Sequence, residues 1–163
     1  MNKFHGTIFR WVTVALALTA LSSCAQIEKA KDKVSIKDTV MSYNKGLADA
    51  SRTGDMKPLE GIASNDVLRK LYYWRAAWSD SNVYMDGTLK DMKFTTVDIT
   101  GQTAKALTTE DWVYTYRNIT TKEVVAPAAG SLYEMEYLLQ KNNNKWVITT
   151  INIKSEKKKV GSE

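Results

Sequence analysis

The spacing of apolar residues changes once along this chain, from a helical period to alternation. Before residue 81 the apolar residues recur at intervals of three and four, which places them on one face of a helix. The first such face comprises Val40, Tyr43, Leu47 and Ala50. We expect this helix to begin at Ser35, with Asp38 three residues later as in a capping box, and to end at Gly54, which can adopt the left-handed conformation.

Two further helices are expected before the period changes. The segment 56–63 follows Asp55, a capping residue, and carries Pro58 in its first turn. A longer helix begins after Ser64 and runs to about Ser79, without an internal glycine or proline. The residues expected on its buried side are Val67, Leu68, Leu71, Tyr72, Arg75 and Trp78.

From Ser81 onward apolar and polar residues alternate, which is typical of strands. We expect a short extended piece punctuated by Asp86-Gly87, and strands over 89–99 (with a bulge), 103–117, 131–140 and 145–153. Turns at 100–102 and 141–144 separate hairpin partners, and 124–130 is an irregular or edge segment because Pro127 cannot donate a ladder hydrogen bond. Helices followed by a curved antiparallel sheet predict an α+β layer fold.

This order of elements resembles the nuclear transport factor two-like superfamily, in which a long helix lies in the cone of a bent, cystatin-like sheet. The matching segments are Tyr43-Asn44 with Leu47, Gly54-Asp55, the strand Trp112 to Arg117, and Tyr133 to Tyr137 facing Lys145 to Ile148. Within the superfamily the chain looks most like the intermembrane-space domain of plastid-division proteins. Those domains act as interaction modules, so the resemblance implies a binding role rather than catalysis.

The first 23 residues have the composition of an export signal. Lys3 and Arg10 precede an apolar run of eleven residues, 11–21, and a spanning helix needs about 20. The sequence Leu21-Ser22-Ser23-Cys24 resembles the lipobox of bacterial lipoprotein signal peptides. The resemblance implies cleavage between Ser23 and Cys24 and attachment of diacylglycerol to the Cys24 thiol, with palmitate-type acylation. Residues 24–35 would then tether the domain 36–153 to the membrane.

The residue after the lipobox bears on the location of the protein. In Gram-negative lipoproteins an aspartate there commonly signals retention in the inner membrane, whereas this chain has Ala25. The resemblance therefore implies the outer membrane, facing the periplasm, in a Gram-negative host, and otherwise the outer face of the cytoplasmic membrane. Nucleic acid is not an expected partner in that compartment.

The charge balance of the chain is basic. The net charge is +5, and removal of residues 1–23, which hold two of the 23 basic residues and none of the 18 acidic ones, leaves +3. Four lysines lie near the C-terminus: Lys154, Lys157, Lys158 and Lys159. We expect residues 154–163 to form a solvated basic tail, with attraction to anionic lipid headgroups as the alternative.

The most restrictive observation concerns histidine and cysteine. His5 is the only histidine and leaves with the signal, while Cys24 is the only cysteine and becomes a thioether. The mature domain therefore has neither Ser-His-Asp nor Cys-His catalysis, no zinc site built on cysteine or histidine, and no disulfide. We expect neither a metal nor a cofactor, and we expect the protein not to be an enzyme.

Aromatic residues supply the remaining candidate site. Trp112, Tyr114 and Tyr116 share a strand face with Glu110, and the full set of candidates is Tyr72, Trp78, Glu110, Trp112, Tyr114, Tyr116, Tyr133 and Tyr137. Three interpretations stay open: the core between helix and sheet, a pocket for a small apolar ligand, and an exposed surface for a protein partner. A homodimer formed through the sheet is also considered.

A catalytic interpretation depends on Glu110. Enzymes of the ketosteroid-isomerase type in this superfamily use a carboxylate base in the pocket, and Glu110 beside Tyr114 is the best candidate here. The Asp-His pair of the dehydratases cannot occur in the mature chain. We expect Glu110 to lie instead at the surface or rim, near lysine or arginine.

Overall fold

A computed structural model of the chain describes residues 5–159, with side chains from Gln26 onward. The chain divides into two units, Met1–Val34 and Ser35–Glu163. The side chains of the predicted signal peptide and of the Cys24 lipidation site lie outside the described residues, as do residues 160–163 of the predicted tail. Among the described residues, no helix is both long enough and apolar enough to cross a membrane.

Helix α1 extends over His5–Thr53, so the prediction that a helix begins at Ser35 is wrong. The Ser35 carbonyl accepts a hydrogen bond from the Thr39 hydroxyl at 2.8 Å, as a residue inside a helix does. The physical reason lies in the predicted tether, whose Glu, Lys and Ala residues favour a helix and include no glycine or proline. The helix ends as predicted before Gly54, whose φ is +81°.

The segment after α1 differs from the predicted helix over 56–63. It forms only a short 3-10 helix, η1 (Lys57–Leu59), with Pro58 in its first turn. Ala63 instead forms a parallel bridge to Ile148, which requires extended backbone and so prevents a longer helix. The next helix, α2 (Asn65–Ser79), has the predicted bounds, and the Ser64 hydroxyl accepts a hydrogen bond from the Val67 amide.

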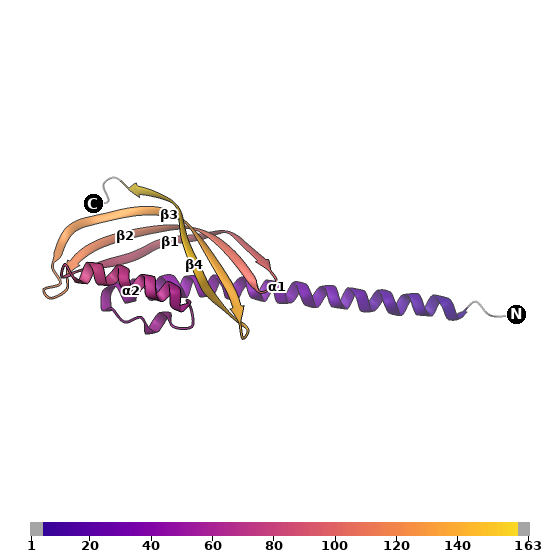
Figure 1. Cartoon of the computed structure of the whole chain (residues 1–163). Helices are drawn as coiled ribbons and strands as arrows, with labels where there is room; N and C mark the ends of the chain where they lie inside the picture. The colour runs from indigo at the N-terminus through magenta and orange to yellow at the C-terminus, as the bar shows by residue number, and fades with distance from the viewer. Residues whose placement is uncertain (1–4, 160–163) are drawn as a thin grey trace. The chain divides into compact units, whose positions relative to one another are not determined.

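Four antiparallel strands form one sheet in the order β1-β2-β3-β4. Their bounds are β1 (Val83–Thr100), β2 (Thr103–Asn118), β3 (Val124–Asn142) and β4 (Lys145–Lys159). In Figure 1 the strands of the second unit bend over α2 and over the C-terminal part of α1. The α+β fold with a curved antiparallel sheet is therefore confirmed.

The strands are longer than the sequence pattern predicts. Gly87 lies inside β1 rather than at a break, opposite Tyr114. Pro127 lies inside β3, where the register shifts between Tyr114 and Tyr116. The predicted bulge in 89–99 is present between Phe94 and Thr96, together with a second register shift between Leu89 and Asp91.

The predicted basic tail is also wrong over 154–159, which belong to β4. Glu134 pairs with Ser155 and Gly130 pairs with Lys159. Backbone hydrogen bonds to β3 hold this polar segment in the sheet although its side chains are exposed, and an apolar pattern alone does not detect such a strand.

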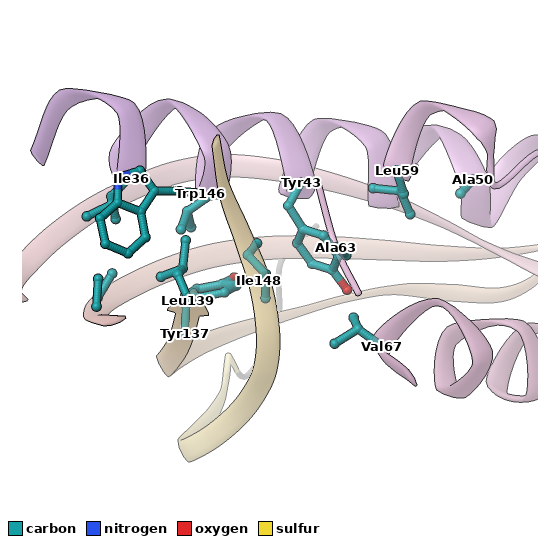
Figure 2. Close-up of a cluster of buried hydrophobic side chains, with 13 residues drawn as sticks. Ile36, Tyr43, Ala50, Leu59, Ala63, Val67, Tyr137, Leu139, Trp146 and Ile148 are labelled. Atoms are coloured by element: carbon teal, nitrogen blue, oxygen red, sulfur yellow. The ribbon is translucent and has the colours of Figure 1, made fainter. Parts of the chain in front are cut away.

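The core lies between α1 and the concave face of the sheet. Figure 2 shows Ile36 and Tyr43 pointing from α1 toward Tyr137, Leu139, Trp146 and Ile148 of β3 and β4, with Ala50 further along the helix beside Leu59. Val40, Tyr43 and Ala50 are buried, and Leu47 packs against the buried cluster, so the predicted face of α1 is confirmed. This packing fills the concavity of the sheet with side chains and determines where a site can form.

Candidate functional site

A buried carboxylate lies at the centre of the concave face. Glu110 of β2 is 1% exposed, and both of its oxygens accept hydrogen bonds from side chains of the same chain. Oε1 accepts from the hydroxyls of Thr108 (2.7 Å) and Tyr137 (2.8 Å) and from the amide of Asn44 (3.3 Å). Oε2 accepts from the indole N–H of Trp112 at 2.9 Å. We call these five residues the Glu110 cage.

Three elements supply the Glu110 cage. Thr108, Glu110 and Trp112 alternate on one face of β2, Asn44 comes from the buried face of α1, and Tyr137 comes from β3. The four donors are neutral, so the prediction that Glu110 lies at a rim near lysine or arginine is wrong. Hydrogen bonding by several donors is what allows a carboxylate to be buried without a cation.

The cage and its surroundings alter the acidity of two tyrosines. Burial, and to a smaller extent the negative charge of the Glu110 carboxylate, raises the pKa of Tyr43 to about 12. The same two causes, in the same order, raise the pKa of Tyr137 well above its ordinary value. Both hydroxyls therefore stay protonated over the whole physiological range, and Tyr137 remains a hydrogen-bond donor to Glu110.

A row of aromatic side chains leads from the Glu110 cage toward solvent. The rings of Trp112 and Tyr114 are stacked with centroids 5.9 Å apart, and Tyr114 meets the edge of Tyr133 at 6.3 Å. The Tyr133 hydroxyl donates to Glu156 of β4 at 3.1 Å. Burial first, and then a hydrogen bond with Tyr133, raises the pKa of Tyr114. This row forms the partly exposed rim of the core.

Gly87 of the neighbouring strand lies beside this row. A Cβ added to Gly87 would lie 3.3 Å from the Tyr114 ring, which is tight, and 3.5 Å from the Trp112 ring, which is an ordinary contact. The absence of a side chain at Gly87 therefore leaves room chiefly for the Tyr114 ring.

The remaining predicted site residues fall into two groups. Trp78 of α2 packs on Tyr116 with centroids 5.0 Å apart, so helix and sheet meet there as predicted. Tyr72 does not join them, because it is 60% exposed and points away from the buried side of α2. The structure thus brings five of the eight candidates together around Glu110, pairs Trp78 with Tyr116 as a separate contact, and excludes Tyr72.

Two residues of the Glu110 cage, Asn44 and Thr108, were not among the predicted site residues. A usable signal was present, because Asn44 follows Val40 by four residues on the apolar face of α1, and Thr108 precedes Glu110 by two on the same strand face. Polar residues on faces that should be buried must find partners, so these three could have been expected to meet.

The outer surface of α2 has a different character. Tyr72, Tyr73 and Trp74 are exposed by 60%, 65% and 37%. Beside Trp74 an open pocket of about 240 Å³ lies between α2 and β4. Its lining comprises Tyr43, Asp66, Val67, Lys70, Leu71, Trp74, Thr149, Thr150 and Ile151. In the part of the chain that the structure describes, no group of three or more His, Cys, Asp or Glu residues is arranged to hold a metal ion.

Comparison with known structures defines the class of fold as nuclear transport factor two-like. The intermembrane-space region of the chloroplast protein ARC6 superposes with a TM-score of 0.62 at 16% identity, covering 72% of this chain and 92% of that one. A putative dehydratase of the NTF2-like family from Streptomyces avermitilis gives a TM-score of 0.50 at 16% identity, with coverage of 74% and 93%. Neither a protein-family model nor a curated protein matches this sequence. At such identities the likeness concerns the fold alone.

Proposed function

We propose that this chain is a lipid-anchored lipoprotein of the cell envelope whose domain binds a protein partner and catalyses no reaction. The observation that carries the proposal is the state of Glu110, the best carboxylate for acid–base chemistry. A general base must lie within about 2.6–3.2 Å of the proton that it removes. Around Glu110 these positions are occupied by donors of the chain itself: the hydroxyls of Thr108 at 2.7 Å and Tyr137 at 2.8 Å, and the indole N–H of Trp112 at 2.9 Å.

The lipid anchor is supported by the sequence Leu21-Ser22-Ser23-Cys24 after an apolar segment too short to span a bilayer. In this proposal Cys24 carries the lipid, and Ala25 directs the protein to the outer membrane, facing the periplasm, of a Gram-negative host. Substitution Cys24→Ala should abolish incorporation of radiolabelled palmitate and release the chain from membranes. Unchanged labelling and attachment in this variant would refute the anchor.

A protein partner is supported by the aromatic side chains on the outside of α2. Tyrosine and tryptophan dominate the energetics of protein interfaces, and Tyr72, Tyr73 and Trp74 leave three large aromatic rings exposed on one helix. A photo-cross-linking amino acid at Tyr73 should give one discrete protein adduct in the host envelope. The same group at Lys105, an exposed residue of β2, serves as the control. Equal labelling from both positions would refute a specific surface.

Two alternative functions, a ligand carrier and an enzyme, would give different experimental results. A carrier of a small apolar ligand should show an adduct of defined mass in native mass spectrometry, lost on Tyr114→Ala. An isomerase-like enzyme should lose its activity on Glu110→Gln while the fold is retained. Either result would replace the interaction module as the best account of the domain.

A further inference from the structure

Strand β4 is an edge strand whose outer side is only partly covered. The loop before α2 reaches it at one residue, where the Ile148 amide donates to the Ile62 carbonyl (2.9 Å) and the Ser64 amide donates to the Ile148 carbonyl (2.8 Å). The chain then turns into α2. Among the described residues, no further backbone partner joins the outer edge of β4 beyond Ile148. An open strand edge of this kind is a template for another strand.

The pocket between α2 and β4 begins where this cover ends. Thr149, Thr150 and Ile151 form its β4 side, and Leu71 and Trp74 form part of its α2 side. Its volume of about 240 Å³ lies below the roughly 300–1,000 Å³ of small-molecule sites. A pocket of this size, with an apolar wall beside a free strand edge, suits one large apolar side chain of a peptide. When a peptide adds to a sheet as a strand, its backbone hydrogen bonds provide affinity and such pockets provide specificity.

Charge indicates what kind of segment fits. Asp66 and Lys70 both line the pocket, and Asp66 also pairs with Arg69 at 2.9 Å, so these three residues together carry one net positive charge. Further along β4, Lys154, Lys157 and Lys158 are exposed and Lys159 is paired with Asp111, whereas the carboxylate among them, Glu156, accepts hydrogen bonds from Ser131 and Tyr133. A second copy of this chain would set these lysines against their counterparts, which opposes edge-to-edge dimers. An acidic segment would instead be attracted to them.

We propose that β4 accepts an extended, acidic segment of a partner protein as a fifth strand, with one large apolar side chain of that segment in the α2–β4 pocket. Acidic residues beside the apolar one face Lys70 and the exposed lysines of β4. Ile153, which is 63% exposed, lies between the pocket and the lysines and offers a second apolar contact. This inference rests on the proposed function, because it names the site and the partner chemistry of the interaction module.

The test uses the full chain in mild detergent and a phage-displayed library of random twelve-residue peptides. We expect enriched peptides to carry net negative charge and a large apolar residue. Measured by fluorescence anisotropy, the best peptide should bind at least about 10-fold more weakly to Trp74→Ala and to Lys70→Glu, which is about 1.4 kcal/mol or more. Lys105→Glu on β2 is the matched charge control and should leave the affinity unchanged. Methylation of alternate peptide nitrogens should abolish binding, because a strand needs those donors.

Several results would overturn the strand-addition proposal. These are enriched peptides that bind Trp74→Ala and Lys70→Glu normally, a dimer of the chain that Trp74→Ala dissolves, and binding of phosphatidylglycerol vesicles through the lysines without any enriched peptide. Circular dichroism of each variant confirms that it is folded. If the library fails while Tyr73 still gives a discrete cross-link, the interaction module stands and only the site is wrong. If both fail, the proposed function is wrong as well.

Discussion

The Glu110 cage makes a quantitative prediction for Tyr137→Phe. This change removes one hydroxyl and leaves the ring of a residue that is 1% exposed, so the packing of the core is kept. What is lost is the 2.8 Å hydrogen bond to Glu110 Oε1, together with the 3.0 Å bond that the hydroxyl accepts from the Asn44 amide, both inside the core where solvent has no access. Hydrogen bonds to charged groups contribute about 1.5–3 kcal/mol. We therefore expect the free energy of unfolding to fall by about 2 kcal/mol.

The matched control is Tyr133→Phe. Its hydroxyl also donates to a glutamate, Glu156, at 3.1 Å, but that pair lies at the exposed rim of the aromatic row. Water can take over the bond there, so we expect a loss below about 0.5 kcal/mol. The Tyr133 hydroxyl also hydrogen-bonds Tyr114 at the same rim, so the comparison contrasts a hydroxyl buried in the core with one that water can reach.

Urea unfolding of residues 24–163 carrying Cys24→Ser, followed by far-ultraviolet circular dichroism, provides the measurement. With a slope of about 1–3 kcal/mol per molar urea, Tyr137→Phe should lower the midpoint by about 1 M at unchanged slope. Similar losses for both variants, or a loss below about 0.5 kcal/mol for Tyr137→Phe, would refute a structural carboxylate that depends on its donors.

Three further predictions concern the same core. Glu110→Gln should destabilise the domain by about 2–3 kcal/mol in urea unfolding, because an amide N–H₂ group replaces one of the two carboxylate oxygens that accept from the four donors. A variant more stable than wild type would instead indicate that the carboxylate is kept for function at a cost in stability. Stability should be full below pH 10 and fall as the pH rises to about 12, because the pKa of Tyr43 is about 12 in the fold and about 10 in the unfolded chain, a shift worth about 3 kcal/mol. Tyr43→Phe should lessen the decline in urea midpoints between about pH 10 and pH 12, so equal slopes in the two chains would contradict this prediction. Gly46→Ala should lower the thermal midpoint although alanine favours helices, because its Cβ would lie 2.6 Å from a methyl carbon of the fully buried Leu59, and a Gly46→Ala chain more stable than wild type would contradict this. Gly61→Ala, at a φ of +75° and with nothing within 4 Å of the added Cβ, shows for comparison the cost of backbone strain without overpacking.

Local chemistry made much of the fold predictable. Ser64 and Gly54 determine where α2 begins and where α1 ends, and both act through their own backbone and side-chain geometry. The alternation that places Glu110 and Trp112 on one face is likewise a property of a single strand. Such features need no knowledge of the rest of the chain.

Features that depend on contacts between distant segments were missed. Ala63 is extended because Ile148 pairs with it, and no residue in 56–63 reveals that partner. The polar end of β4 is a strand because β3 lies beside it. Glu110 was assigned to the surface because its partner on the helix, Asn44, lies 66 residues earlier in the chain. In each case the sequence contains the residues but not the register that brings them together.

The Glu110 cage and the proposed β4 surface divide the domain into two parts that variants can separate. Asn44 ties α1 to β2 and β3 at the centre of the sheet, so the cage determines how the helix fills the concavity. A binding surface must then lie outside, where α2 and the edge of β4 meet. Tyr137→Phe should therefore lower the midpoint of urea unfolding without changing peptide affinity in the folded chain, whereas Trp74→Ala should weaken the peptide with a smaller loss of stability, since Trp74 is 37% exposed. Parallel losses of stability and affinity in both variants would mean that the cage and the surface act as one unit, and that the cone interior takes part in binding.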